Sequence, residues 1–267
     1  MAVKKKLSPF GIDGMRAFRK FFAYSVSAYA IMLVLVLASI ALSIGSYSYP
    51  SATSSIFALM GGGAALSMAL AVIIAVLIGL SVYAVISLML GIRDVRRSGL
   101  AGFKLYASVS KWLKASTVTY ALLFVAFGYT SILSAINAIQ GAYLGGSVQN
   151  GMLSAIEFVL WIALLAIDVV FAFEMSRVFK GMSKDLAQTR LSISGNTLLL
   201  GISVLVASSL ISTVYGFLLP PSALQAYAAS IPQPVSLALL IVDAIGIAVL
   251  AASSWFGYRG ASASLGV

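Results

Sequence analysis

Four acidic residues, Glu157, Asp168, Glu174 and Asp243, lie inside long apolar stretches of this 267-residue sequence. An ionisable side chain near the centre of a bilayer costs about 2.5–3.5 kcal/mol on insertion scales, and such side chains commonly mark functional sites. The apolar stretches contain no Lys, Arg or His that could pair with Asp168 or Asp243. We therefore expect hydroxyl, amide or backbone partners for both carboxyl groups. Such groups suit a proton relay or a cation site, and they suit equally a hydrogen bond that joins two helices.

The spacing of these acids predicts which of them act together. Glu157 and Asp168 are eleven residues apart, which is about three helical turns, so they share one face of a helix. Asp243 lies in the last apolar stretch, at a depth in the membrane comparable to that of Asp168. Glu174 faces elsewhere and can pair with Arg177 at i+3. The candidate intramembrane ion or proton site is therefore Asp168, Asp243 and Glu157.

The elements that must position these residues are membrane-spanning helices. Hydrophobic residues make up 61% of the chain and charged residues 9%, whereas soluble domains are about 25% charged. A span needs about 20 mainly apolar residues, and the runs here lack the alternation of a barrel strand. The sequence thus predicts an all-α, polytopic integral membrane protein that forms a single transmembrane domain over residues 1–267. The six predicted spans cover residues 22–46, 64–90, 116–140, 152–176, 195–219 and 234–258.

The cations predict the orientation of these spans. All 17 Lys and Arg residues lie before the first span, between the second and third, between the fourth and fifth, or at the end of the sixth. The three alternate loops contain no charged residue. Because cations in short loops stay on the cytoplasmic side, this pattern predicts a cell-membrane protein with both termini cytoplasmic. Arg93, Arg177 and Arg259 recur at spacings of 84 and 82 residues, which favours three antiparallel hairpins, although any six-span protein with this charge pattern has a similar rhythm.

Two cationic segments, residues 8–20 and 99–115, are too polar to span but carry regular apolar positions. A helix of this kind can lie in the headgroup layer with its cations toward anionic lipid. The candidate contacts with anionic lipid headgroups are Arg96, Arg97, Lys104, Lys111 and Lys114. The alternative is that these cations only fix the topology.

Small residues recur at every fourth position in three spans: Ala71, Ala75 and Gly79; Ser208, Ser212 and Gly216; and Ala244, Ala248 and Ala252. Stripes of this kind allow close contact between helices in membranes. They favour packing within a bundle.

The sequence excludes several kinds of chemistry. It has no Cys and no His, so thiolate, disulfide and imidazole chemistry are impossible. No phosphate-binding glycine motif or paired metal-ligand spacing occurs in a credible context. We expect no catalytic residues, no cofactor, no metal and no nucleic-acid partner.

Three functions remain open. A non-catalytic structural or accessory subunit of a membrane complex, or a homo-oligomer, explains the small-residue stripes and the shortage of reactive groups. A proton- or cation-coupled transporter or channel explains the buried acids. A membrane-embedded enzyme would have only Glu174 with Arg177 as a candidate acid–cation pair.

Two short motifs carry a resemblance to a known family. Residues 11–20 read GIDGMRAFRK and precede the first span, and residues 91–99 read GIRDVRRSG and follow the second. In these motifs the first half of the chain resembles an uncharacterised family of six-span membrane proteins from crenarchaeal archaea. The resemblance implies an archaeal cell membrane. It brings no activity and no site residues.

Overall fold

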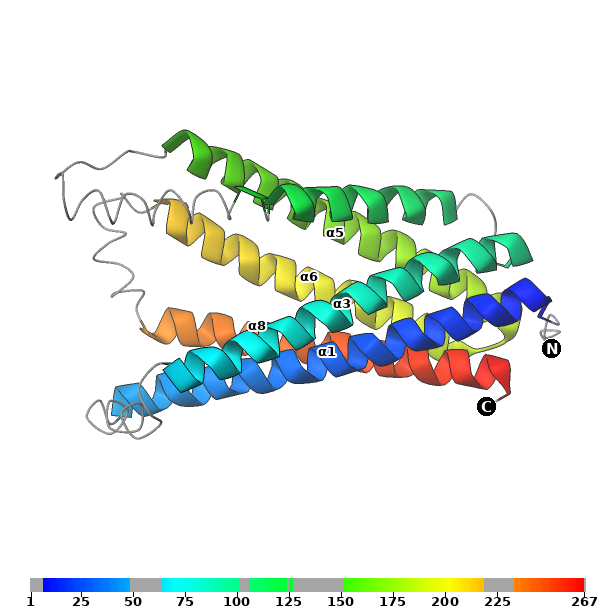
Figure 1. Cartoon of the computed structure of the whole chain (residues 1–267), viewed down its shortest axis with the longest axis horizontal. Coiled ribbons are helices and arrows are strands. Elements are labelled where there is room, and N and C mark those ends of the chain that lie inside the picture. Colours follow the sequence, from blue (N-terminus) through cyan, green and yellow to red (C-terminus); the bar gives the residue numbers. More distant parts are fainter. Residues whose placement is uncertain are drawn as a thin grey trace.

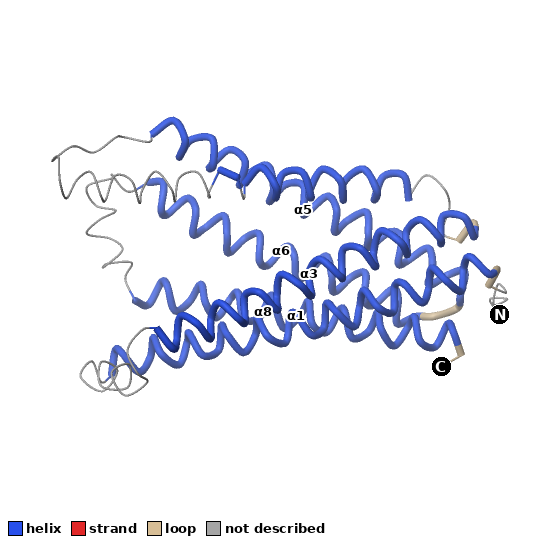
Figure 2. Tube along the Cα trace, viewed as in Figure 1, coloured by secondary structure: helices blue, strands red, loops and turns tan. Residues whose placement is uncertain are grey.

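The computed structural model describes residues 7–48, 64–100, 106–123, 125–126, 151–218 and 233–266. These residues form six helices that lie roughly along the long axis of the molecule, as Figure 1 and Figure 2 show. They are α1 (Pro9–Ser48), α3 (Ala64–Ser98), α5 (Gly151–Leu186), α6 (Thr189–Leu218), α8 (Gln233–Leu265) and a helix over residues 106–123 and 125–126, here called the third helix. The predicted all-α class is confirmed for the described residues.

Five of these helices, α1, α3, α5, α6 and α8, are long and apolar enough to cross a membrane. They contain the predicted spans 22–46, 64–90, 152–176 and 234–258, and α6 contains the predicted span 195–219 except for its last residue. The predicted span 116–140 begins inside the third helix. From residue 127 onward it lies outside the described residues.

The helices are longer than the bilayer requires. At 1.5 Å per residue the 40 residues of α1 measure about 60 Å, twice the roughly 30 Å of a hydrocarbon core. Much of the excess lies at the end of the bundle where α1 begins and α3, α5 and α8 end, close to both labelled chain ends (Figure 1). We call this end the cationic end, because Arg16, Arg93, Arg177 and Arg259 lie in these parts of the helices.

The cationic segments differ from the expected separate interfacial helices. Residues 9–20 are the first turns of α1, and the helix continues from them without a break into the predicted first span. Gly11 and Gly14 do not interrupt it. Gly14 packs closely on α3, where a Cβ would lie only 2.9 Å from the backbone nitrogen of Val95. Of the predicted segment 99–115, residues 106–115 are the first part of the third helix. Helix packing therefore holds these segments in the bundle.

One cluster of buried side chains joins all six helices at the cationic end. We call it the cap core, and it comprises Met15, Phe18, Phe22, Leu88, Ile92, Val95, Leu100, Tyr106, Val109, Leu113, Met175, Val178, Phe179, Met182, Leu186, Leu191 and Ala261. Three of its phenylalanines pack together, with the Phe179 ring centroid 6.0 Å from that of Phe18 and 5.4 Å from that of Phe22. Apolar burial drives packing where water is the alternative, but it does not favour helix association inside lipid. An apolar core is therefore expected at an end of the bundle, where the helices extend beyond the lipid.

Farther along the bundle, α6 and α8 approach each other closely at two glycines. A Cβ at Gly201 would lie 2.7 Å from Leu250 Cδ2, and a Cβ at Gly246 would lie 2.7 Å from Leu205 Cδ2. Each glycine thus admits a leucine of the opposite helix, as close contacts in membranes require. The small-residue stripe predicted on α8 does not make this contact, since Ala248 and Ala252 of that stripe are exposed.

A tight turn joins α5 to α6. The amide of Gln188 donates to the carbonyl oxygen of Ser183 at 3.0 Å, and Ala187 between them has a φ of 52°. This is the Schellman arrangement, in which the left-handed position is normally a glycine. A left-handed residue with a Cβ costs about 1–2 kcal/mol.

We expect Ala187→Gly to stabilise the protein by about 1 kcal/mol, because glycine removes the strain of the left-handed position. The measurement is thermal unfolding of the purified protein in detergent, where the midpoint should rise. Ala187→Val should lower the midpoint. Equal midpoints for the glycine and valine variants would contradict this reading of the turn.

Candidate functional site

Asp168 belongs to a hydrogen-bonded cluster between α5 and the third helix. Ser116 Oγ donates to Asp168 Oδ1 at 3.0 Å, and Tyr120 Oη donates to Asp168 Oδ2 at 3.2 Å. Ser116 and Tyr120 are four residues apart, so one face of the third helix supplies both donors. The expectation of a hydroxyl partner is therefore confirmed for Asp168. Both carboxyl oxygens are bonded, and the cluster ties two helices together.

We expect the Ser116–Asp168 bond to contribute about 0.6 kcal/mol, and at most about 1.7, the range measured for side-chain hydrogen bonds in membrane proteins. A double-mutant cycle of Ser116→Ala and Asp168→Ala, followed by thermal unfolding in detergent, measures this coupling. Thr117→Val is a matched control, because the Thr117 hydroxyl donates to the carbonyl oxygen of Leu113 in its own helix. A coupling energy of zero between Ser116 and Asp168 would refute this hydrogen bond. An equal coupling energy between Thr117 and Asp168 would refute it as well.

Asp243 lies in a different place. It lines a cavity of about 250 Å³ between α5, α6 and α8, together with Trp161, Ser208, Ser209, Ser212 and Leu239. One carboxyl group and three hydroxyl groups provide the oxygen ligands that hard cations and water prefer. Within the described ranges no group of three acidic side chains could hold a metal ion. This arrangement can hold water or a small monovalent cation.

The structure thus separates the acids that the sequence analysis grouped. Among the described residues no contact joins Asp168 to Asp243, and each lies against its own set of hydroxyl groups. Glu157 lies within α5, but its side chain is outside the described residues. Glu174 pairs with Arg177 at 3.4 Å through both carboxylate oxygens, which confirms the predicted i+3 pair.

The sequence alone does not place the serines of this cavity beside Asp243. The spacing of Ser208 and Ser212 predicts a packing stripe, whereas the structure shows both residues lining the cavity with Asp243. The signal was present, because hydroxyl groups one turn apart on an apolar helix can serve a buried carboxyl group as well as a close packing contact.

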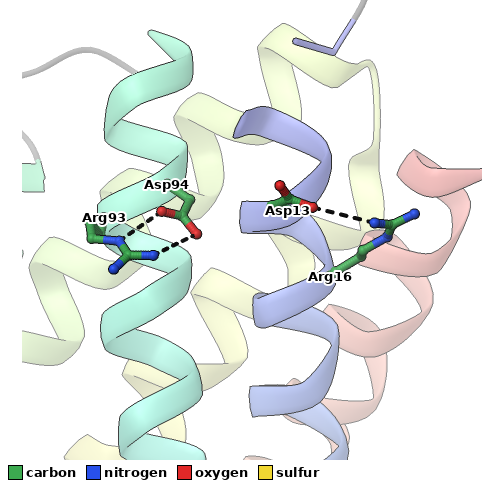
Figure 3. A network of polar contacts seen from close by, with 4 residues as sticks. All are labelled: Asp13, Arg16, Arg93 and Asp94. Carbon is green, nitrogen blue, oxygen red and sulfur yellow. Dashed lines mark hydrogen bonds and ion pairs between the residues drawn. The ribbon is translucent and has the colours of Figure 1, made fainter. Parts of the chain in front are cut away.

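Two acids at the cationic end, Asp13 and Asp94, form local ion pairs. Arg16 lies 3.3 Å from Asp13 on α1, and Arg93 lies 2.8 Å from Asp94 on α3. Figure 3 shows both pairs. The two pairs lie on neighbouring helices with no drawn contact between them. Each of these two acids is thus neutralised by a cation on its own helix.

The candidate lipid-contacting cations divide into separate groups. The guanidinium of Arg97 lies 5.9 Å from the ring centroid of Phe10 in α1, and the ammonium of Lys111 lies 5.6 Å from the ring of Trp112. Arg96 and Lys114 instead line one cavity between α3 and the third helix. Lys104 lies outside the described residues.

The described side chains therefore provide an interhelical carboxylate cluster at Asp168, a polar cavity at Asp243 and a cationic face. Comparison with known proteins finds no family model, no curated protein and no solved structure that matches this chain.

Proposed function

We propose that the chain is a non-catalytic, multi-pass subunit of a membrane complex with a structural or accessory role. In this proposal it crosses the cell membrane as three antiparallel hairpins with both termini cytoplasmic. The gathering of cations at one end of the bundle supports this orientation, because cationic segments stay on the cytoplasmic side.

The outer face of α3 carries the proposal. Its exposed large apolar residues include Val72, Ile74, Val76, Ile78, Val82 and Ile86. Within this face Ala75 is exposed, and a Cβ at Gly79 would meet nothing within 4 Å. Small residues four apart on an apolar helix are the usual means of close helix contact in membranes. Among the described residues no helix of this chain occupies the position in front of Gly79, so a helix of another subunit can pack there.

Native mass spectrometry of the protein extracted from its own membrane in mild detergent tests this proposal. We expect other membrane proteins to be present in fixed stoichiometry. Gly79→Leu should remove them without lowering the thermal midpoint of the isolated chain, since a Cβ there meets nothing within 4 Å. Val159→Leu adds bulk at an exposed position of α5 and should leave the complex intact. Recovery of the native chain alone would overturn the proposal.

A second function, proton- or cation-coupled transport, is favoured by the cavity at Asp243. A carboxyl group among three hydroxyl groups is a suitable stopping point for a proton or a monovalent cation on its way across a bilayer. The test is proton and sodium flux in proteoliposomes of purified protein. If the protein is a transporter, Asp243→Asn should abolish the flux. Asp168→Asn should reduce the flux less, because hydrogen bonds to the third helix already occupy the Asp168 carboxyl group. No flux above that of empty liposomes would eliminate this function.

A further inference from the structure

The cavity between α3 and the third helix at the cationic end has a volume of about 350 Å³. Its polar lining consists of Arg93, Arg96, Tyr106, Ser110 and Lys114. The three residues from the third helix are four residues apart in sequence, so they lie in one row along that helix. Its apolar lining includes Met89, which is 40% exposed and continues the apolar outer face of α3.

The lining is strongly cationic. Arg93, Arg96 and Lys114 face a single cavity. Asp94 accepts from Arg93 Nε at 2.8 Å and from Arg93 Nη2 at 3.4 Å. These bonds use two of the five N–H donors of the guanidinium group. The described residues of the cavity lining thus include three cations and no acid.

Tyr106 is the least expected member of the lining. Its side chain is 1% exposed, and its hydroxyl group has no hydrogen-bond partner among the described residues. A buried polar group without a partner costs about 1–3 kcal/mol, so its presence calls for an explanation. Burial raises the pKa of the Tyr106 phenol, with a smaller contribution from Asp185, so the hydroxyl stays protonated and remains a donor.

We infer that this cavity binds a phosphate group through Arg93, Arg96, Lys114 and the hydroxyl groups of Tyr106 and Ser110. Arginine, lysine and hydroxyl donors around one space form the usual binding set for phosphate oxygens. The phosphate belongs to an anionic phospholipid or to a soluble phosphate ester, since both present the same oxygens. Basic pockets between membrane helices at the cytoplasmic side commonly bind lipid headgroups, and the apolar wall at Met89 gives an acyl chain a path along α3.

A lipid titration of the full-length protein in detergent, read by native mass spectrometry, tests the inference. Phosphatidylglycerol should bind more tightly than phosphatidylcholine. Lys114→Gln should weaken phosphatidylglycerol binding about tenfold, the effect of losing one charged hydrogen bond. Lys111→Gln is the matched control on the same helix, because Lys111 lies against Trp112 and outside the cavity lining, and it should leave binding unchanged. Tyr106→Phe keeps the ring and should weaken binding several-fold.

Competition by inorganic phosphate identifies the source of the group. If phosphatidylglycerol stays bound in excess inorganic phosphate, the cavity binds the lipid. If inorganic phosphate displaces phosphatidylglycerol and its own binding depends on Lys114, the cavity binds a soluble phosphate. Either result supports a phosphate site. Equal binding of the two lipids, or equal loss from Lys114→Gln and Lys111→Gln, would overturn it.

Discussion

Phe179→Ala is expected to lower the free energy of unfolding by about 3–5 kcal/mol, the usual cost of truncating a buried phenylalanine. The Phe179 side chain is fully buried in the cap core, where it packs edge-on to Phe18 and against Phe22. Truncation would leave a cavity in the cluster that joins all six described helices. The loss should therefore affect the whole bundle.

Phe173→Ala provides the matched control for this substitution. Phe173 is on the same helix and is 50% exposed, with the Arg177 guanidinium 5.8 Å from its ring centroid. Its truncation leaves no closed cavity, so we expect a loss below about 1 kcal/mol. Unfolding in detergent, by heat or by denaturant, measures both variants. Similar losses for Phe179→Ala and Phe173→Ala would show that the cap core is not the main source of stability.

Gly257→Ala is expected to destabilise the protein by about 1–3 kcal/mol, the usual cost of overpacking a core. A Cβ at Gly257 of α8 would overlap the ring of Phe22 in α1. That ring cannot easily move, because Phe18, Phe21 and Phe179 surround it at centroid distances of 5.1–6.4 Å. The contact between α1 and α8 would therefore have to open.

The same substitution at Gly79 should have the opposite sign. A Cβ there meets nothing within 4 Å, and alanine is favoured over glycine in a helix by about 1 kcal/mol. Thermal midpoints of the two variants in one detergent should thus lie on either side of the parent value. A midpoint for Gly257→Ala equal to or above that of Gly79→Ala would contradict the close packing of α1 on α8.

The helices could be predicted from the sequence because a run of apolar residues long enough to span a bilayer is a strong signal by itself. The position of the core could not. Met15, Phe18 and Met182 lie among cations in segments interpreted as loops or interfacial helices, yet these side chains are fully buried. Charged side chains can point outward from a helix whose other face is packed, so local composition conceals the burial.

The candidate site was predictable in part. The intramembrane carboxyl groups stand out in any apolar sequence, and the hydroxyl partners of Asp168 were expected as a class. Which hydroxyls are used depends on which helix lies beside which, and the spacing within one helix does not specify that. The same reason explains why the row of Tyr106, Ser110 and Lys114 was not identified, since its partners Arg93 and Arg96 come from α3.

Our central proposal is that the helices cross the membrane with the cap core and both termini on the cytoplasmic side. Because the chain has no Cys, single-cysteine labelling with a membrane-impermeant maleimide tests the claim without background. Ser147→Cys, in the charge-free segment 141–151, should be labelled in intact cells. Asp13→Cys and Lys184→Cys, at exposed positions of the cationic end, should be labelled only after the membrane is opened. Labelling of Lys184→Cys in intact cells, or labelling of Ser147→Cys and Lys184→Cys from the same side, would contradict it.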